Sequence, residues 1–142
     1  MHLELVAGEP LDQQRHLLFS PRPVDEREPL LYHKTTHRPW YDRAMKAVRA
    51  DRCYDVAFVN TRGALTEGAR SNLFARIGGV LYTPPVGCGL LPGVLRGRLL
   101  RRGACVEREL LPADLQRAEA VYCGNSVRGL ARVTPDFSGG KR

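Results

Sequence analysis

Apolar and polar positions alternate along this chain in short runs, which predicts a mixture of strands and helices. Alternating or continuous apolar runs predict strands over residues 3–6, 16–19, 55–60, 64–66, 71–77, 80–83, 104–109, 120–123 and 130–133. Helical spacing of apolar residues predicts helices over residues 38–52, 91–102 and 112–118. Pro39 suits a first helical position, and Gly103 is a typical helix stop.

Two turn signals show how the strands connect. Asn60–Gly63 and Gly78–Gly79 each separate two strand runs and predict hairpins. Elsewhere strands alternate with helices, so both kinds of connection are present. The sequence therefore predicts an α/β (mixed α+β) fold, an irregular mixed-sheet pseudo-barrel with flanking helices, in preference to a doubly wound sheet.

The length of 142 residues corresponds to a single main domain. Ser20–Pro29 holds three prolines and five charged residues, which predicts a linker. We expect residues 1–29 to hold remnant strands and this Pro-rich linker, residues 30–135 to form the main domain, and residues 136–142 to be a polar tail. No internal repeat is evident.

A formal net charge of +7 raises the question of an anionic partner. The apolar share of 43% and the charged share of 26% are those of an ordinary globular protein. No aromatic-interleaved basic stripe, zinc spacing or helix-turn-helix pattern accompanies the charge, so nucleic acid is not the favoured partner. A small anionic substrate, a basic module that binds an anion or RNA, and a general preference for Arg all remain compatible with it.

The four cysteines show neither a metal pattern nor a dense disulfide framework. They are separated by 35, 17 and 18 residues without any C-x-x-C pair. Scattered thiols fit a reducing compartment, and the sequence has neither a signal peptide pattern nor an apolar run long enough to cross a bilayer. We expect a cytoplasmic protein with no metal site and no membrane partner.

Lys34 is the candidate reactive amine. The chain holds three lysines, at positions 34, 46 and 141, against 19 arginines, so positive charge is normally supplied by Arg. Arg cannot replace an amine that must lose its proton to attack a carbonyl. His33, His37 and Arg38 adjoin Lys34, and neighbouring positive charge lowers a lysine pKa towards the nucleophilic range. The alternative is a surface or phosphate-binding lysine.

Further groups would complete a site for an aldehyde cofactor such as pyridoxal phosphate. Glu67, an isolated carboxylate before a Gly-containing turn, is the candidate acid for the ring nitrogen, although a surface turn glutamate is the common alternative. Gly93 precedes a predicted helix start, which offers backbone N–H groups to a phosphate. Gly124–Ser126 offers amide, hydroxyl and backbone donors at a strand end.

These positions carry a resemblance to the class IV aminotransferases, the pyridoxal phosphate enzymes of fold type IV. The matching residues follow the spaced signature of that family over about 30 positions: Glu67, Ala69, Asn72, Leu73, Phe74, Leu81, Thr83, Leu91, Gly93, Val94 and Arg96. The family places its lysine some thirty-odd residues before the glutamate, as Lys34 precedes Glu67 here. His33–Arg38 and Gly124–Gly129 are most similar to the 4-amino-4-deoxychorismate lyases of the family, including forms fused behind aminodeoxychorismate synthase.

The resemblance implies a role for each of these positions. Residues 30–135 would form the pyridoxal 5'-phosphate-binding domain, like the larger C-terminal domain of fold type IV enzymes. Lys34 would bond to the cofactor and act as acid and base. Glu67 would bond the ring nitrogen. The phosphate would be held by the backbone of Val94 and Leu95 and by Asn125 or Ser126.

The implied reaction releases pyruvate from 4-amino-4-deoxychorismate and leaves 4-aminobenzoate, a folate precursor. The rivals are a D-amino-acid or branched-chain aminotransferase, and a non-catalytic fragment or anion-binding basic module. Relatives carry a smaller N-terminal domain that supplies an Arg to the cofactor phosphate, whereas about 30 residues precede Lys34 here. We therefore expect the lysine-bearing portion of such an enzyme, inactive alone or completed by an N-terminal domain, an aminodeoxychorismate synthase component or a second copy in a homodimer.

Overall fold

The computed structural model describes residues 15–33 and 38–138 of the chain. Within these ranges the chain forms eight strands, with three α-helices and two short 3₁₀ turns between them. The strands are β1 (His16–Phe19), β2 (Asp55–Val59), β3 (Leu65–Gly68), β4 (Asn72–Ile77), β5 (Val80–Thr83), β6 (Val106–Glu107), β7 (Ala120–Asn125) and β8 (Gly129–Pro135). The helical elements are η1 (Pro29–Tyr32), α1 (Pro39–Arg49), η2 (Val86–Cys88), α2 (Val94–Arg101) and α3 (Pro112–Arg117).

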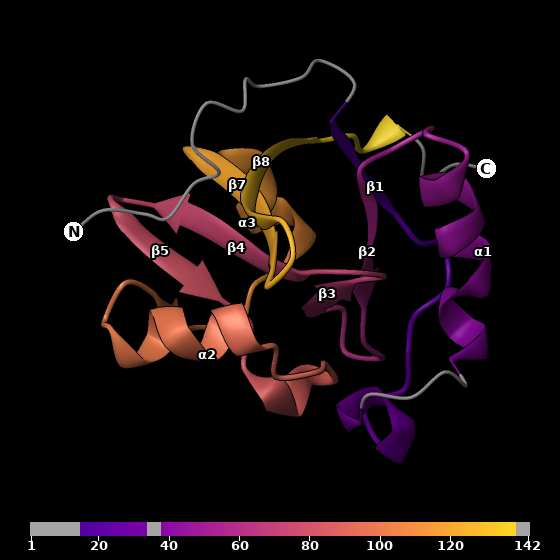
Figure 1. Cartoon of the computed structure of the whole chain (residues 1–142), viewed down its shortest axis with the longest axis horizontal. Helices are drawn as coiled ribbons and strands as arrows, with labels where there is room; N and C mark the ends of the chain where they lie inside the picture. The colour runs from indigo at the N-terminus through magenta and orange to yellow at the C-terminus, as the bar shows by residue number, and fades with distance from the viewer. Residues whose placement is uncertain (1–14, 34–37, 139–142) are drawn as a thin grey trace.

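The strands form one mixed sheet with the order β3-β2-β1-β8-β7-β4-β5-β6. The pairs β1–β2, β1–β8 and β5–β6 are parallel, and the remaining neighbours are antiparallel. The sheet curls, as Figure 1 shows. One edge strand, β3, approaches the segment that follows the other edge strand, β6, and the Leu65 N–H donates to the Leu110 carbonyl there at 2.7 Å. The predicted irregular pseudo-barrel and its mixed sheet are confirmed.

Strand β1 is an internal strand of this sheet. It pairs with β2 through Leu17 and Asp55, and with β8 through His16 and Thr134. It lies within the range expected to hold remnant strands and a linker, yet Leu17 has no exposed surface and belongs to the central core. The described part of residues 1–29 therefore shares the sheet and the core of the segment that follows it.

The segment predicted as a linker packs against the sheet. Val24 is buried and forms a parallel bridge with Asn60. Glu26 accepts hydrogen bonds from the hydroxyl and the backbone N–H of Thr61, which hold the pKa of Glu26 at about 2. At the other end, Phe137 stacks on Phe19 with ring centroids 4.8 Å apart.

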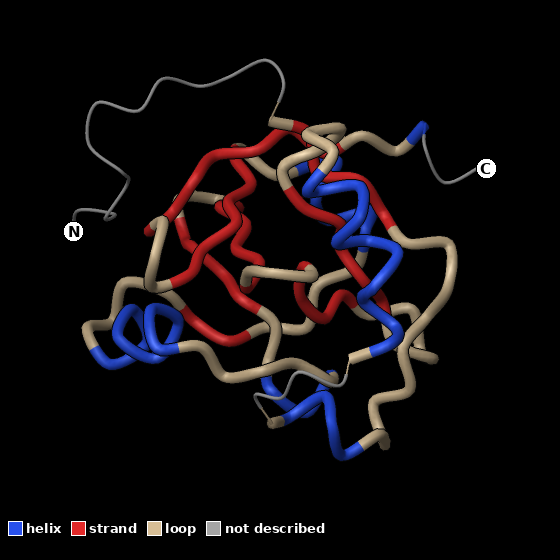
Figure 2. Tube along the Cα trace, turned by 45° about the vertical axis from the view of Figure 1, so that its right-hand side comes forward, coloured by secondary structure: helices blue, strands red, loops and turns tan. Residues whose placement is uncertain are grey.

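Helices α1 and α2 lie outside the strands on different sides of the molecule (Figure 2). Helix α1 begins at Pro39, as predicted, and packs through Tyr41 and Ala44 against β2. Helix α2 packs through Leu95 and Leu99 against β4 and β7. No helix within the described residues is long and apolar enough to span a membrane.

Candidate active site

Glu67 is a buried carboxylate on strand β3. Its exposed fraction is 4%, which overturns the alternative of a surface turn glutamate. The hairpin with β2 places it there, because Ala57 pairs with Gly68 and Val59 with Leu65 on either side. Thr66 next to it is also fully buried and donates its hydroxyl to the Phe58 carbonyl at 3.1 Å. This part of β3 is therefore enclosed on both of its faces.

Three donors from the described residues hold the Glu67 carboxylate. Arg38 Nη2 lies 3.0 Å from Oε2 and forms an ion pair with it. The Tyr41 hydroxyl donates to the same oxygen at 2.8 Å, and the backbone N–H of Leu91 donates to Oε1 at 3.2 Å. A carboxylate offers about four acceptor positions, so these donors leave one, on Oε1.

Burial raises the pKa of Glu67 from 4.5 to about 7, and the hydrogen bond from Tyr41 and the charge of Arg38 oppose that rise. Burial also raises the pKa of Tyr41 well above its ordinary value, with the nearby Glu67 charge adding to the effect, so Tyr41 stays a neutral donor. Near neutral pH, Glu67 is therefore present in both its acid and its ionised form.

The turn that follows Glu67 is pinned by a second buried carboxylate. Asp55 has no exposed surface, and its oxygens accept from Val56 N–H at 2.8 Å, Ala69 N–H at 2.9 Å, Arg70 N–H at 3.3 Å and the Ser71 hydroxyl at 2.5 Å. Gly68 is required here, because a Cβ at that position would lie 2.2 Å from Asp55 Oδ2. Asp55 thereby fixes the turn between β3 and β4.

Beyond this turn, Asn72 connects β4 to the start of helix α2. Its side-chain amide donates to the Leu91 carbonyl at 3.0 Å, and a Cβ on Gly93 would lie 2.4 Å from its Oδ1. Leu91 therefore bonds to Glu67 through its N–H and to Asn72 through its carbonyl. Gly93 is the N-cap of α2 and makes no side-chain capping bond, and Val94 is 66% exposed.

The turn between β7 and β8 lies next to this cluster. Gly124 packs close to α2, since a Cβ there would lie 3.2 Å from Leu95 Cδ2. The Asn125 amide donates to the Arg70 carbonyl at 3.0 Å, and its Oδ1 accepts from Val127 N–H at 3.0 Å and Arg128 N–H at 2.8 Å. The Asn125 side chain therefore holds the turn together, whereas Ser126 beside it is exposed.

The structure thus links Glu67 by a hydrogen bond to Leu91, three residues before α2, and places Gly124, which precedes Asn125, against Leu95 of α2. No bond of Val94 or Ser126 to these groups is seen among the described residues. Lys34 lies outside the described residues. Arg38 was predicted from the sequence as a positive neighbour of Lys34, and its ion pair with Glu67 was not predicted. The available signal was the carboxylate itself, because a buried Glu requires a paired cation or hydrogen-bond donors.

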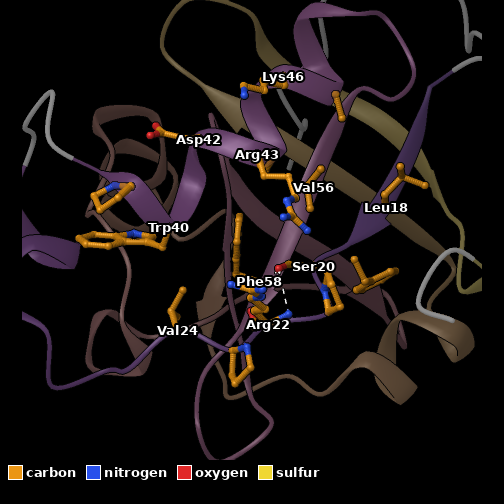
Figure 3. Close-up of a pocket in the computed structure, with 16 residues that line it drawn as sticks. Leu18, Ser20, Arg22, Val24, Trp40, Asp42, Arg43, Lys46, Val56 and Phe58 are labelled. Carbon is orange, nitrogen blue, oxygen red and sulfur yellow. Dashed lines mark hydrogen bonds between the residues drawn. The ribbon is translucent and has the colours of Figure 1, made fainter. Parts of the chain in front are cut away.

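A separate cavity of about 610 Å³ opens between α1 and residues 18–24 (Figure 3). Val56 and Phe58 of β2 also line it, and Arg22, Arg43 and Lys46 stand around it. Glu67, Val94, Leu95, Asn125 and Ser126, the candidate site residues that the structure describes, do not line this cavity.

Comparison with known proteins identifies the family of this chain. The family model described as amino-transferase class IV matches residues 4–135. The chain belongs to this family. The match covers every described element from β1 to β8, including the hairpin that carries Glu67.

Individual relatives carry more specific names. A "putative aminodeoxychorismate lyase" of Schizosaccharomyces pombe is 33% identical over 112 residues, which cover 75% of this chain and 48% of the relative. A "putative amino-acid aminotransferase" of Mesorhizobium loti is 36% identical with a TM-score of 0.83, covering 96% of this chain and 65% of that one. A "putative 4-amino-4-deoxychorismate lyase" of Legionella pneumophila is 29% identical with a TM-score of 0.75, covering 95% and 50%.

The chain spans about half the length of the curated relative and about two thirds of the Mesorhizobium loti structure.

Proposed function

We propose that this chain binds pyridoxal 5'-phosphate and provides the lysine-bearing part of a lyase that converts 4-amino-4-deoxychorismate to 4-aminobenzoate and pyruvate. The observation that carries the proposal is the buried Glu67 carboxylate, bonded through Leu91 to the segment that opens α2. The lyase names of the Schizosaccharomyces pombe and Legionella pneumophila relatives support the choice of reaction.

The described residues fit the cofactor. Glu67 keeps one acceptor position on Oε1 for a ring N–H. The first turn of α2 has backbone N–H groups without a side-chain cap, and such a helix start binds a phosphate through these groups and the helix dipole. Ser126, which is exposed, would add a hydroxyl to the phosphate site. The acid on strand β3 and the anion-binding groups on helix α2 and the β7–β8 turn would therefore come from three separate segments of the chain.

Bound pyridoxal phosphate draws electrons from a substrate carbon into its ring. This chain's residues would support that chemistry in distinct ways. Lys34 would hold the cofactor, take a proton from the substrate and return one at the end. Glu67 would hold the proton of the ring nitrogen. Val94, Leu95 and Ser126 would bind the phosphate. Aromatisation of the ring of the substrate drives the loss of pyruvate.

The experiment uses borohydride reduction of the chain with pyridoxal phosphate, followed by peptide mapping. We expect the label on Lys34, with Lys46 and Lys141 as internal controls in the same digest. Lys34→Arg keeps the positive charge but cannot release its proton at working pH, so it should abolish labelling. Label confined to the two control lysines would refute cofactor binding at this site.

The reaction is tested separately, by measuring pyruvate release from 4-amino-4-deoxychorismate without any keto acid. Release that requires Lys34 supports the lyase. The similarity to the Mesorhizobium loti protein favours a second candidate, an amino-acid aminotransferase. Amino transfer from a D-amino acid or a branched-chain amino acid to a keto acid, without pyruvate release from aminodeoxychorismate, would decide for that candidate.

A further inference from the structure

The carboxylate of Glu67 faces two opposing demands. It is 4% exposed, and burial favours its neutral acid form. A glutamate that holds a protonated ring nitrogen must instead be ionised, because a neutral acid gives that proton no countercharge. Some group on the protein therefore has to keep the charge on Glu67 in a place that water does not reach.

Arg38 is placed to do this. Among the described residues it forms an ion pair with Glu67, with Nη2 3.0 Å from Oε2 and 18% of its side chain exposed. Its guanidinium carbon also lies 4.3 Å from the centre of the Tyr41 ring, which fixes the plane of the group. Charge-assisted hydrogen bonds of this kind are about twice as strong as neutral ones, and little solvent is present to screen them.

Tyr41 fixes the direction of the carboxylate. Its ring packs on Phe58 with centroids 4.4 Å apart and is 2% exposed, so its hydroxyl cannot move away from Oε2. With Arg38 and Tyr41 both on Oε2, the other oxygen keeps its remaining acceptor position. Oε2 therefore accepts two hydrogen bonds and Oε1 accepts one, so that Oε1 can still accept a hydrogen bond from a ring N–H.

We infer that Arg38 is a positioning residue that keeps Glu67 ionised and, with Tyr41, leaves Oε1 to receive the protonated ring nitrogen of the cofactor. The inference rests on the proposed function and assigns to Arg38 a role separate from any contact with the cofactor itself.

The other described groups near Glu67 give no second source of positive charge for the carboxylate. These groups are Arg38, the N-cap residue of α1, Tyr41 in the first turn of that helix, and the neutral Leu91 N–H from the segment before α2. From β2, Asp55 acts on Tyr41 and raises its pKa further. Loss of Arg38 should accordingly leave Glu67 protonated at neutral pH.

The first measurement needs no cofactor. Carboxyl ¹³C NMR follows the titration of Glu67 in the apo chain, with Glu67→Gln identifying the signal. We expect Arg38→Gln to raise the Glu67 midpoint by about one pH unit or more, and Arg38→Lys to keep most of the wild-type value because it retains the charge. Arg43→Gln, a change at an exposed arginine of α1, five residues after Arg38, is the matched control and should leave the midpoint unchanged.

The second measurement is the Kd of pyridoxal phosphate as a function of pH. At neutral pH we expect Arg38→Gln to weaken binding about tenfold, and the loss to shrink at alkaline pH, where Glu67 ionises without help. In a Glu67→Gln background, Arg38→Gln should change the Kd by less than about twofold, since the two residues act through one interaction. Tyr41→Phe keeps the ring packing and should weaken binding less than Arg38→Gln.

Two results would overturn the inference. One is an equal Glu67 midpoint in wild type, Arg38→Gln and Arg38→Lys. The other is an equal loss of affinity from Arg38→Gln with and without Glu67. If Arg38→Gln does not fold, Arg38→Met, which keeps the aliphatic stem of the side chain and removes the charge, takes its place in both comparisons. If the wild-type chain binds no pyridoxal phosphate, the proposed function fails, while the NMR titration still decides whether Arg38 sets the charge of Glu67.

Discussion

Replacing Asp55 tests how the candidate site is supported. Its buried carboxylate accepts four hydrogen bonds, three of them from the turn that links the Glu67 strand to the Asn72 strand. Asp55→Ala removes every acceptor at once. The substitution should loosen the turn and lower the stability of the whole sheet, because Asp55 lies at the start of β2 beside β1.

The size of the effect follows from the donors that lose a partner. A buried donor without an acceptor costs about 1–3 kcal/mol. The Ala69 N–H keeps a second acceptor in the Val56 carbonyl at 3.1 Å, so the free-energy cost is smaller than that of four lost hydrogen bonds. We expect Asp55→Ala to cost about 3 kcal/mol, which is a melting temperature lower by about 9 °C at this chain length. Asp55→Asn keeps one oxygen and can donate to Ser71, so it should cost about 1 kcal/mol.

Urea unfolding followed by circular dichroism measures both variants against wild type. The slope of the unfolding free energy against urea should stay the same, which shows that the substitutions change stability and not the surface exposed on unfolding. The reasoning is refuted if Asp55→Ala unfolds within 1 kcal/mol of wild type, or if Asp55→Asn is as unstable as Asp55→Ala.

Three further predictions concern protonation, packing and thiol reactivity. Because the pKa of Glu67 rises from 4.5 to about 7 on folding, its contribution to stability is full below pH 4.5 and is lost as the pH rises to 7. The difference in unfolding free energy between wild type and Glu67→Gln should therefore change by about 3 kcal/mol over that range, and a constant difference would contradict the assignment. Gly93→Ala should cost about 1 kcal/mol in urea unfolding, because its Cβ displaces the Asn72 amide, whereas Gly87→Ala enters open space and should be neutral. Equal stability of these two glycine variants would show that the contact is not tight. The four cysteines are free and buried, and burial raises the pKa of Cys123 well above its ordinary value, so a disulfide reagent should modify the thiols slowly in the native protein and rapidly in denaturant. Rapid native modification would contradict the packing around them.

Short-range sequence signals correctly predicted the helix ends and hairpin turns that depend on one or two residues. Pro39 marks the start of α1, and Gly103, with a φ of 73°, lies just beyond the end of α2. The predicted hairpins around residues 60–63 and 78–79 are present as β2–β3 and β4–β5. In each case a residue with restricted or unusual backbone freedom acts on its immediate neighbours, so a short window is enough to detect it.

Features that depend on distant pairing left weaker signals. The position of β1 between β2 and β8 has no local signature. Asp55 could have been noticed as an acid that opens an apolar run, since such a residue needs buried donors. For Asn125, the sequence suggested an anion ligand, whereas its side chain holds the turn and bonds to Arg70. The ion pair between Glu67 and Arg38 could not be predicted from the sequence either, because Arg38 lies 29 positions earlier in the chain.

The pairing of β1 with β8 has a consequence for how this protein is made. The hairpins can form as soon as their own residues leave the ribosome, because their partners are neighbours in sequence. The two halves of the sheet meet at a strand of four residues near the beginning, whose second partner contains Thr134. During synthesis β1 therefore keeps one unpaired edge until the residues of β8 have emerged, and in that interval the nascent protein is most exposed to wrong strand pairing.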